Sequence, residues 1–480
     1  MSSGRANCSD TVRASCAATC LATKHAHINM TEIRRVAKEW REKDELRTMT
    51  ADFAGRLASP LTFDTIDEEI NFSFLSDMLQ FGSGFREELT KHGKRGASDT
   101  MLYGMLGLHM QFGNLTADRL SILTRPEIAT IFGIPLDEEY EMQPGIRSIR
   151  PSPLAPLVNA IWATIQQAVS NLRSRMLPDF AAFVRTTLTK KPSAQYLISE
   201  IVSTFPNVFA DVAKLSIPPP TTNSGSEVQV SSESQQAESQ TQSGSQDNKP
   251  KQQNVQYECH ILKKAQLVVS NLYYRFFERE PQLFAFTDWG SAPLTIFADN
   301  VIPTVLCSMG IISLSPRILK AINDGEDMSY NVACHLRAAA VTASELLLNE
   351  LNAPVSDVSE SKSEAADETK TEGASEEKTT DEEKRADATE KPSAQDGSSA
   401  EDQPAEEIKK GSRPLQNVVP FTTKYTNEEI DLITKLMETP SPSRSTFSAP
   451  ELDHALWRLG KSNRQYRETK RLSCKNTVFF

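Results

Sequence analysis

The sequence lacks the short motifs and long apolar runs by which many enzymes and membrane proteins are identified. It contains no GxGxxG, GxxxxGK[ST], GxSxG or HExxH motif, which argues against the common dinucleotide and phosphate loops, the serine nucleophile elbow and the zinc-protease site. No apolar run reaches the roughly 20 residues that a membrane-spanning helix needs. We therefore expect no membrane partner and none of these catalytic frameworks.

Cysteine pairs at metal-binding spacing are also lacking. The seven cysteines include no CxxC pair, and their odd number argues against a complete disulfide framework, so a reducing compartment fits best. Cys8, Cys16 and Cys20 precede His25 and His27, but without the ligand spacing of a zinc finger. We predict neither a metal nor a cofactor.

An excess of positive charge is missing as well. The chain carries 52 Lys and Arg against 63 Asp and Glu. Residues 356–410 hold 18 of the acidic and 8 of the basic residues, so the rest of the chain is nearly neutral. Proteins that hold duplex DNA or whole tRNA usually show a basic excess. We therefore expect no duplex nucleic acid as a partner, although a small basic pocket is compatible with this charge.

Two segments cannot build a hydrophobic core. Residues 219–254 are rich in Ser, Gln, Thr and Pro, residues 354–410 are rich in Glu, Lys, Ser and Ala, and neither contains an aromatic residue. We predict both to be disordered insertions. Residues 1–30 are predicted to be a disordered leader. Their Arg5, Arg13 and Lys24 against the single Asp10 weakly resemble a mitochondrial transit peptide, so we expect a cytoplasmic location with mitochondrial association as the alternative.

The remaining parts, residues 31–218, 255–353 and 411–480, show the 3.6-residue period of amphipathic helices. Apolar residues step by three or four at positions 157, 161, 165, 168 and 172, at 261, 265, 268, 272 and 276, and at 332, 336, 339, 343 and 346. Period-two alternation is almost absent. We predict one all-α domain built from the three parts, and we expect a monomer.

Two acidic residues stand in patterns that suggest chemistry. Asp299 lies inside the apolar stretch 295–303 (TIFADNVIP), where a buried carboxylate needs a partner or a task, or where Asp299 or Asn300 caps a helix that begins near Pro303. Asp453 and Trp457 lie four residues apart in the predicted helix 452–461 (LDHALWRLGK) and so share one face. An acid beside an aromatic ring suits a flat heterocycle, and the alternative is a surface acid beside a core tryptophan.

Three basic residues interrupt apolar helices. Lys263 and Lys264 form a pair in the helix near 258–277, where a solvated face is the simpler interpretation and a phosphate contact is the alternative. Arg337 stands within 336–340 (LRAAA), a pattern that fits either a buried ion-pair partner or an anion ligand. The sequence alone leaves both questions open.

Several stretches, taken in order, resemble the queuosine salvage family in its fungal-like form. They are 69–74 (EINFSF), 81–86 (FGSGFR), 93–97 (GKRGA), 263–267 (KKAQL), 296–303 (IFADNVIP), 306–314 (LCSMGIISL), 336–340 (LRAAA), 452–457 (LDHALW) and 477–480 (TVFF). No single stretch is specific, but the ordered set is. Residues 1–30 and the two predicted insertions lie outside the resemblance.

The resemblance implies an all-α fold related to the helix-hairpin-helix DNA glycosylases. It also implies an N-glycosyl hydrolase that cleaves queuosine 5′-phosphate and releases queuine for salvage into tRNA modification. In the family, the Phe and Asp of an FAD-containing motif and a C-terminal Asp line the queuine pocket, which corresponds here to Phe297, Asp299 and Asp453. A family lysine associated with the phosphate corresponds to Lys263 or, less directly, Lys264.

The chain also departs from the family pattern. Asn300 and Val301 stand where many relatives have Tyr-Arg, His454 stands where many have Tyr, Arg458 stands where many have Asp, and 331–335 (NVACH) replaces acidic residues. Family contacts through these positions do not carry over, although His454 stays a candidate substrate-binding residue.

We expect Asp299 to act on the charge that develops on the sugar and Asp453 to bind the N–H edge of the base, with Trp457 and Phe297 as apolar walls. The exchanged assignment of the two acids stays open. The alternative functions are a non-catalytic queuine-binding or tRNA-modification accessory protein and a DNA-lesion glycosylase, the latter disfavoured by the neutral charge.

Overall fold

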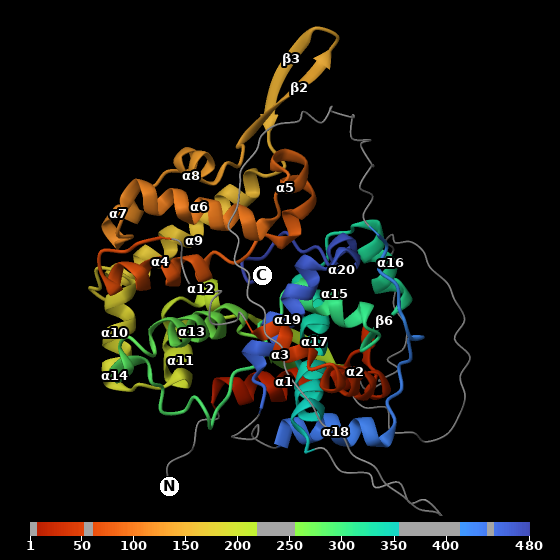
Figure 1. Cartoon of the computed structure of the whole chain (residues 1–480). Helices are drawn as coiled ribbons and strands as arrows, with labels where there is room; N and C mark the ends of the chain where they lie inside the picture. Colours follow the sequence, from red (N-terminus) through yellow and green to blue (C-terminus); the bar gives the residue numbers. More distant parts are fainter. Residues whose placement is uncertain (1–6, 52–60, 218–254, 355–412, 439–445) are drawn as a thin grey trace, which may run out of the picture. The chain divides into compact units, whose positions relative to one another are not determined.

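A computed structural model describes residues 7–51, 61–217, 255–354, 413–438 and 446–480. Described residues 7–353 and 413–480 form one compact unit. Its regular structure is predominantly helical with a few short strands (Figure 1), so the predicted all-α class is confirmed. The two predicted insertions lie almost wholly outside the described residues, and the likeness to helix-hairpin-helix glycosylases stays a prediction.

The first half of the unit carries most of the short helices. Its elements are α1 (Cys8–Ala22), β1 (Ala26–Ile28), α2 (Met30–Glu42), α3 (Glu45–Thr50), α4 (Ile66–Met78), the 3-10 turn η2 (Ser83–Phe85), α5 (Arg86–Gly93), α6 (Ala97–Phe112), α7 (Ala117–Ser121), α8 (Arg125–Phe132), β2 (Asp137–Gln143), β3 (Ile146–Pro151), α9 (Ala155–Ser174), α10 (Phe180–Lys190), α11 (Ala194–Thr204), α12 (Pro206–Phe209) and β4 (Val212–Ile217). The predicted helix at 157–172 is confirmed as α9.

The second half supplies the longest helix of the described chain. Its elements are β5 (Val255–His260), α13 (Lys263–Phe276), α14 (Pro281–Phe284), α15 (Val301–Ser308), β6 (Ile312–Leu314), α16 (Pro316–Asp324), α17 (Tyr330–Asn352), α18 (Asn427–Glu438), α19 (Ala449–Ser462) and α20 (Arg464–Glu468). The helices predicted from the periodicity at 261–276 and 332–346 are confirmed as α13 and α17, and the helix predicted at 452–461 is confirmed as α19. No described helix combines the length and apolar character of a membrane span.

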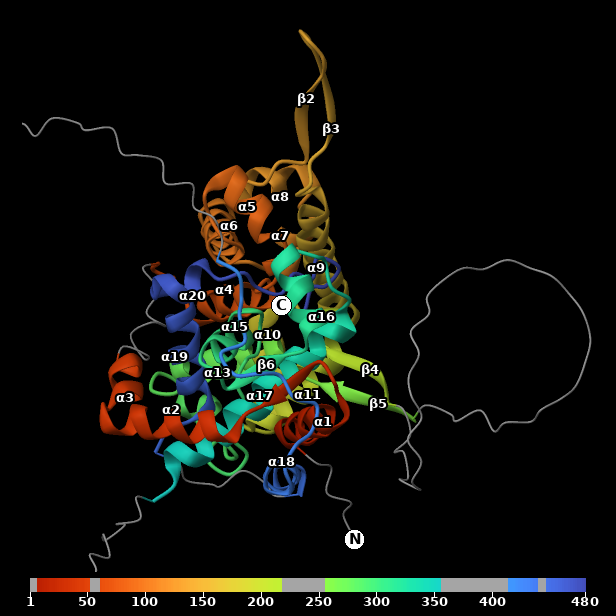
Figure 2. The same cartoon turned by 90° about the vertical axis from the view of Figure 1, so that its right-hand side faces the viewer.

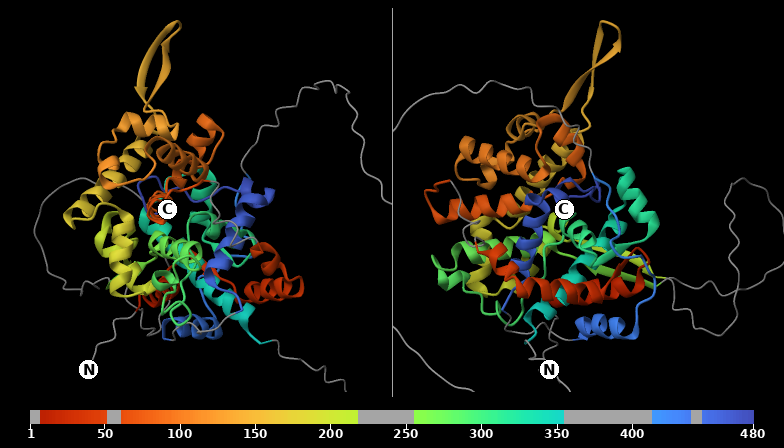
Figure 3. Two further views of the ribbon diagram at one scale, coloured as in Figure 1. Left: turned by 60° about the vertical axis from the view of Figure 1, so that its left-hand side comes forward. Right: turned by 45° about the vertical axis from the view of Figure 1, so that its right-hand side comes forward.

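The strands form three separate two-stranded antiparallel pairs: β1 with β6, β2 with β3, and β4 with β5. The β2–β3 hairpin projects away from the helices in every view (Figures 2 and 3). The other two pairs join segments far apart in the sequence, as where Ala26 pairs with Leu314. The β4–β5 pair brackets the undescribed residues 218–254 and places α13 directly after it.

The prediction of a disordered leader is wrong for residues 8–28. Helix α1 packs against α17, α18 and β5, and Val12, Cys16 and Cys20 are fully buried on it. The face of α1 that packs consists mainly of small residues, which allow close helix approach but give a weak amphipathic signal. The sequence pattern therefore resembled an unstructured terminus.

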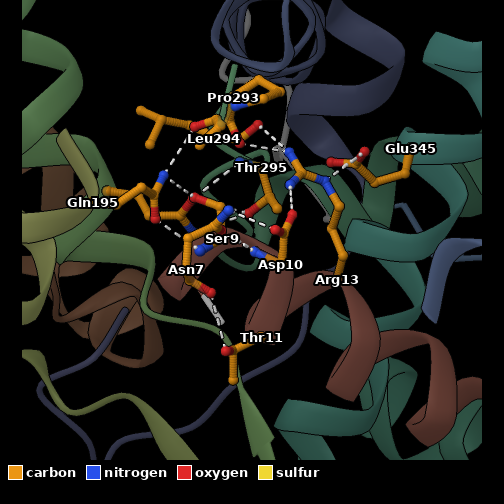
Figure 4. Close-up of polar contacts among 12 residues, drawn as sticks. Asn7, Ser9, Asp10, Thr11, Arg13, Gln195, Pro293, Leu294, Thr295 and Glu345 are labelled. Atoms are coloured by element: carbon orange, nitrogen blue, oxygen red, sulfur yellow. Dashed lines mark hydrogen bonds and ion pairs between the residues drawn. The ribbon is translucent and has the colours of Figure 1, made fainter. Parts of the chain in front are cut away.

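Helix α1 is also fixed by buried polar contacts (Figure 4). Arg13, which contributed to the transit-peptide interpretation, is buried and donates from Nε to Glu345 on α17 at 3.0 Å. Its Nη2 donates to the carbonyl oxygens of Pro293 and Leu294 at 2.6 and 3.1 Å. These bonds tie α1 and α17 to the segment that leads into the stretch around Asp299.

Candidate functional site

A pocket in the compact unit is lined by residues from both halves of the chain. The turn after α4 contributes Gln80, Phe81 and Ser83, and the starts of α5 and α6 contribute Arg86 and residues 96–98. The second half contributes Lys263, residues 299–301, Trp457, Lys461, Arg471 and Phe480. The fold therefore brings three predicted site residues, Lys263, Asp299 and Trp457, to one place.

Asp299 both caps a helix and lines the pocket. Its Oδ1 accepts hydrogen bonds from the backbone N–H groups of Val301 at 2.6 Å and Ile302 at 3.2 Å, at the start of α15. The capping interpretation is thus confirmed, with the helix beginning two residues earlier than Pro303. Both capping bonds use Oδ1, so capping and a role of Oδ2 in the pocket are compatible.

Phe297, which lies two residues before Asp299, contacts Asp453. The backbone N–H of Phe297 donates to Oδ1 of Asp453 at 2.7 Å, and both residues are buried. His454 is buried as well, and none of the three is among the described residues that line the pocket. Asp453 is therefore not the surface acid of the alternative interpretation, and its hydrogen bond to Phe297 joins α19 to the stretch that carries Asp299.

Arg337 forms a buried ion pair, as one of the two interpretations predicted. Its side chain is fully buried and donates to both carboxylate oxygens of Asp211, at 2.9 and 2.6 Å. Its third donor, Nε, binds the carbonyl oxygen of Ala298 at 2.8 Å, and its guanidinium lies 4.3 Å from the ring centroid of Phe480. Arg337 thus positions two parts of the pocket, the backbone before Asp299 and the ring of Phe480.

Asp211 was not foreseen from the sequence. Besides Arg337, it accepts a bond from the hydroxyl of Tyr330 at 2.6 Å. Its Oδ2 also lies 3.4 Å from the backbone nitrogen of Lys263, the first residue of α13. A lone Asp in a short apolar stretch carries no periodic signal, so only the fold shows that Asp211 connects α13 with α17.

The two lysines are buried, so the predicted solvated face is wrong. Lys263 lines the pocket and its Nζ donates to the carbonyl oxygen of Gln80 at 3.0 Å. Burial lowers the pKa of the Lys263 ammonium group, and the nearby carboxylate of Asp299 opposes this shift. Lys264 instead donates to the carbonyl oxygen of Met78 at 2.8 Å and is absent from the described pocket lining. The structure therefore favours Lys263 over Lys264 as a ligand-contacting residue.

Helix α19 presents Trp457 and Lys461 to the pocket. The helix begins with a capping box between Ser448 and Glu451, and its side chains at 457 and 461 follow one another by one turn. The Nζ of Lys461 lies 5.1 Å from the ring centroid of Trp457. Arg458, a departure from the family pattern, points elsewhere and donates to the carbonyl oxygen of Met49 at an exposed position.

The sequence did not predict that the pocket would also be lined by Arg86, Lys461, Arg471 and Phe480. Arg86 and Phe480 do fall at the ends of two family-like stretches, 81–86 and 477–480, which was the available signal. The C-terminal segment reaches the pocket by passing close to Gly84. A Cβ atom at position 84 would lie 2.6 Å from the carbonyl oxygen of Cys474, so a larger residue there would obstruct this segment.

The comparison with protein-family models supports the resemblance. Residues 246–372 match the queuosine salvage protein family. The expected likeness to this family is thereby confirmed over that part of the chain, and a role in queuosine salvage is supported. A search of curated proteins found no match.

Only some of the pocket residues lie inside the segment that matches the queuosine salvage family. Lys263, Asp299 and the positioning residue Arg337 lie inside the matched segment. The residues contributed by 80–98 and by α19 and the C-terminal segment lie outside it. The structure brings both groups to one pocket, which is what a single substrate site requires.

Proposed function

We propose that this protein hydrolyses the N-glycosidic bond of queuosine 5′-phosphate and releases queuine. The observation that carries the proposal is the placement of Asp299 in a pocket with Lys263 and Trp457. Asp299 and Lys263 lie in the segment that matches the queuosine salvage family. A carboxylate, a flat aromatic side chain and a cation are the groups that a purine-like nucleotide needs for cleavage and binding.

The chemistry requires stabilisation of a sugar cation. Cleavage of a nucleoside bond develops positive charge on the ribose ring, which a nearby carboxylate stabilises. Queuine is a 7-deazaguanine and lacks the N7 atom that many purine glycosylases protonate. More of the barrier must then be lowered at the sugar, and we assign this role to Asp299, through Oδ2.

Asp453 holds the pocket wall in this proposal. Its bond to the backbone N–H of Phe297 fixes the chain two residues before Asp299. Arg337 fixes the intervening carbonyl of Ala298. With the two residues before it held in this way, Asp299 keeps its position without reorganisation during the reaction, which is the basis of electrostatic catalysis. A direct contact of Asp453 with the base edge is the competing assignment.

The test is incubation of the purified full chain with queuosine 5′-phosphate, with free queuine measured by chromatography and mass spectrometry. We expect catalytic release that is lost or strongly reduced in Asp299→Ala. Asp431→Ala, an acidic position on the distant helix α18, is the matched control and should release queuine at the wild-type rate. Binding of queuine without turnover would favour the accessory-protein alternative.

A further inference from the structure

The β2–β3 hairpin extends from the helical body, meaning the compact unit without this hairpin (Figures 1 and 2). None of its residues is buried, and its two strands pack mainly on each other. Met142, Ile146 and Ile149 are 58%, 53% and 71% exposed on it. A two-stranded hairpin alone is at best marginally stable in water, and exposed apolar side chains grouped together are typical of interaction surfaces. The hairpin is therefore a candidate interface.

The two strands of the hairpin carry opposite charges. Strand β2 (DEEYEMQ) has four acidic residues and no basic one, whereas β3 (IRSIRP) has Arg147 and Arg150 and no acid. Within the hairpin Glu138 pairs with Arg150, with their charged groups 2.6 Å apart. Charged side chains on an edge strand oppose the addition of another strand, and two β2 strands side by side would set acid against acid. The outer edge of β2 is therefore protected against self-pairing.

The outer edge of β3 lacks this protection. Strand β3 pairs with β2 on one side, and no other strand of the described chain pairs with it on the other side. Pro151 has no N–H group to donate at the end of the strand, which leaves residues 146–150 for pairing. The centre of this stretch is Ser148. An antiparallel pair of two β3 strands, related by a twofold axis at Ser148, would therefore use the whole stretch.

This register suits the side chains on both strands. It sets Ser148 opposite Ser148 of the second copy, Ile149 opposite Arg147 of the second copy, and Ile146 opposite Arg150 of the second copy. No arginine faces another arginine, and each isoleucine can cover the aliphatic part of an arginine side chain. Arg147 keeps Glu141 of its own hairpin on its other side. Because the strands are antiparallel and the hairpin projects (Figure 3), the two helical bodies lie at opposite ends of the new sheet.

We propose that two copies of this protein form a reversible homodimer by pairing their β3 strands. The product is a four-stranded antiparallel sheet in the order β2, β3, β3, β2, and its acidic outer strands prevent further addition. The proposal departs from the monomer expected from the sequence, and it does not depend on queuine release. Because the paired edge is short, the interface belongs to the small, transient class, so the dimer should form only at micromolar concentrations.

Sedimentation velocity of the full chain over a concentration series is the first test. We expect a shift from monomer to dimer with a dissociation constant on the order of 10–100 µM. Ile149→Lys should weaken the dimer about 10-fold or more, because the new lysine opposes Arg147 of the second copy and loses the apolar contact. Within its own hairpin this lysine faces Glu139, so the hairpin itself should be retained. Ile122→Lys, at a side chain 67% exposed outside the hairpin, is the matched control and should dimerise as the wild type does.

Cross-linking tests the register. Six of the seven native cysteines are buried and Cys8 is partly buried, so the wild type should react little with a short bismaleimide. Ser148→Cys places two thiols next to the proposed twofold axis and should yield covalent dimers on denaturing gels. Asp118→Cys, at a side chain 91% exposed on α7, is the control and should stay monomeric on such gels. Absence of cross-linking in Ser148→Cys, with dimers present in solution, would overturn the pairing of β3 with β3.

Removal of the hairpin gives an independent test. Asp137 pairs with Pro151, and the N–H of Ser152 donates to the carbonyl oxygen of Leu136 at 2.8 Å, so the two ends of the hairpin lie side by side at its base. Replacement of residues 138–150 by Asn-Gly can therefore close the chain with a tight turn. This variant should be monomeric at every concentration and should unfold thermally as the wild-type monomer does.

Two results would overturn the proposal. One is a wild type that stays monomeric over the whole concentration series. The other is a dimer that Ile149→Lys does not weaken, which remains decisive if the hairpin deletion fails to fold. Neither result bears on the proposed function, because queuine release is measured separately and at concentrations where the monomer predominates.

Discussion

The Nε atom of Arg337 donates a hydrogen bond at 2.8 Å to the carbonyl oxygen of Ala298, the residue immediately before Asp299. The same guanidinium is held by both oxygens of Asp211, and the whole side chain is buried. The position of the pocket carboxylate is therefore coupled to an ion pair in the core. A change at Asp211 should affect folding and catalysis together, although Asp211 is not a pocket residue.

Asp211→Asn tests this coupling. Removal of the negative charge leaves the Arg337 guanidinium buried and unbalanced, and breaking such a pair typically costs about 3–5 kcal/mol. We expect a decrease of this size in the free energy of unfolding measured with urea. Asp118 pairs with Arg173, and its own side chain is 91% exposed. Asp118→Asn should therefore change the free energy of unfolding by less than about 1 kcal/mol. Similar small effects in both variants would show that the buried pair contributes little.

Gly460 provides a steric test of the packing between α15 and α19. A Cβ atom at this position would overlap Cγ1 of Val301 and approach Cγ2 of Val305 to 3.1 Å. Gly460→Ala should therefore displace Val301, which lines the pocket, and lower kcat/KM despite the better helix propensity of Ala. The double variant Gly460→Ala with Val301→Ala removes the overlap and should recover much of the activity. Wild-type kinetics in Gly460→Ala would contradict this packing.

The pH dependence of substrate binding follows from the buried lysines. Burial lowers the pKa values of the Lys263 and Lys461 ammonium groups, and the positive charge of Arg471 lowers that of Lys461 further. Both lysines therefore lose their charge at a lower pH than an exposed lysine does. As pH rises above neutral, the KM for queuosine 5′-phosphate should increase, because fewer cations face the phosphate. The KM for queuosine should not follow this rise. In Lys461→Arg the increase should move to higher pH, and an unshifted profile would argue against Lys461 as a contributor.

Part of this fold follows from periodicity, because apolar residues recur every three or four positions along the stretches that form α9, α13 and α17. Helix α1 was missed because small residues pack its buried face without a large apolar stripe. The residues of the site also differ in how clearly the sequence indicates them. Asp299, Trp457 and Lys263 stand out locally, as charged or aromatic residues in apolar stretches. Arg86, Arg471 and Asp211 do not stand out in the sequence, because their roles depend on contacts with residues that are far away along the chain.

The two acids near the pocket differ in what their oxygens already bind, and this difference makes their roles separable. Asp299→Asn keeps an oxygen that can cap α15, since Asn caps about as well as Asp. It loses the charge that stabilises the sugar cation, so kcat should fall on the order of 100-fold while queuine affinity is retained. Near-normal turnover in this variant would leave Asp299 with the capping role alone.

Asp453 is tested with two substitutions. Asp453→Asn keeps an oxygen that can accept from the N–H of Phe297, whereas Asp453→Ala removes the acceptor and leaves that N–H buried without it. If Asp453 acts by positioning, the Asn variant should be mildly affected, and the Ala variant should lose both turnover and stability. If Asp453 instead binds the N–H edge of the base, the Asn variant alone should already weaken queuine affinity, because an amide presents a donor where an acceptor is needed. Measuring queuine affinity, kcat and unfolding for both variants decides between the two roles. Loss of turnover alone in Asp453→Asn would exchange the assignments of the two acids.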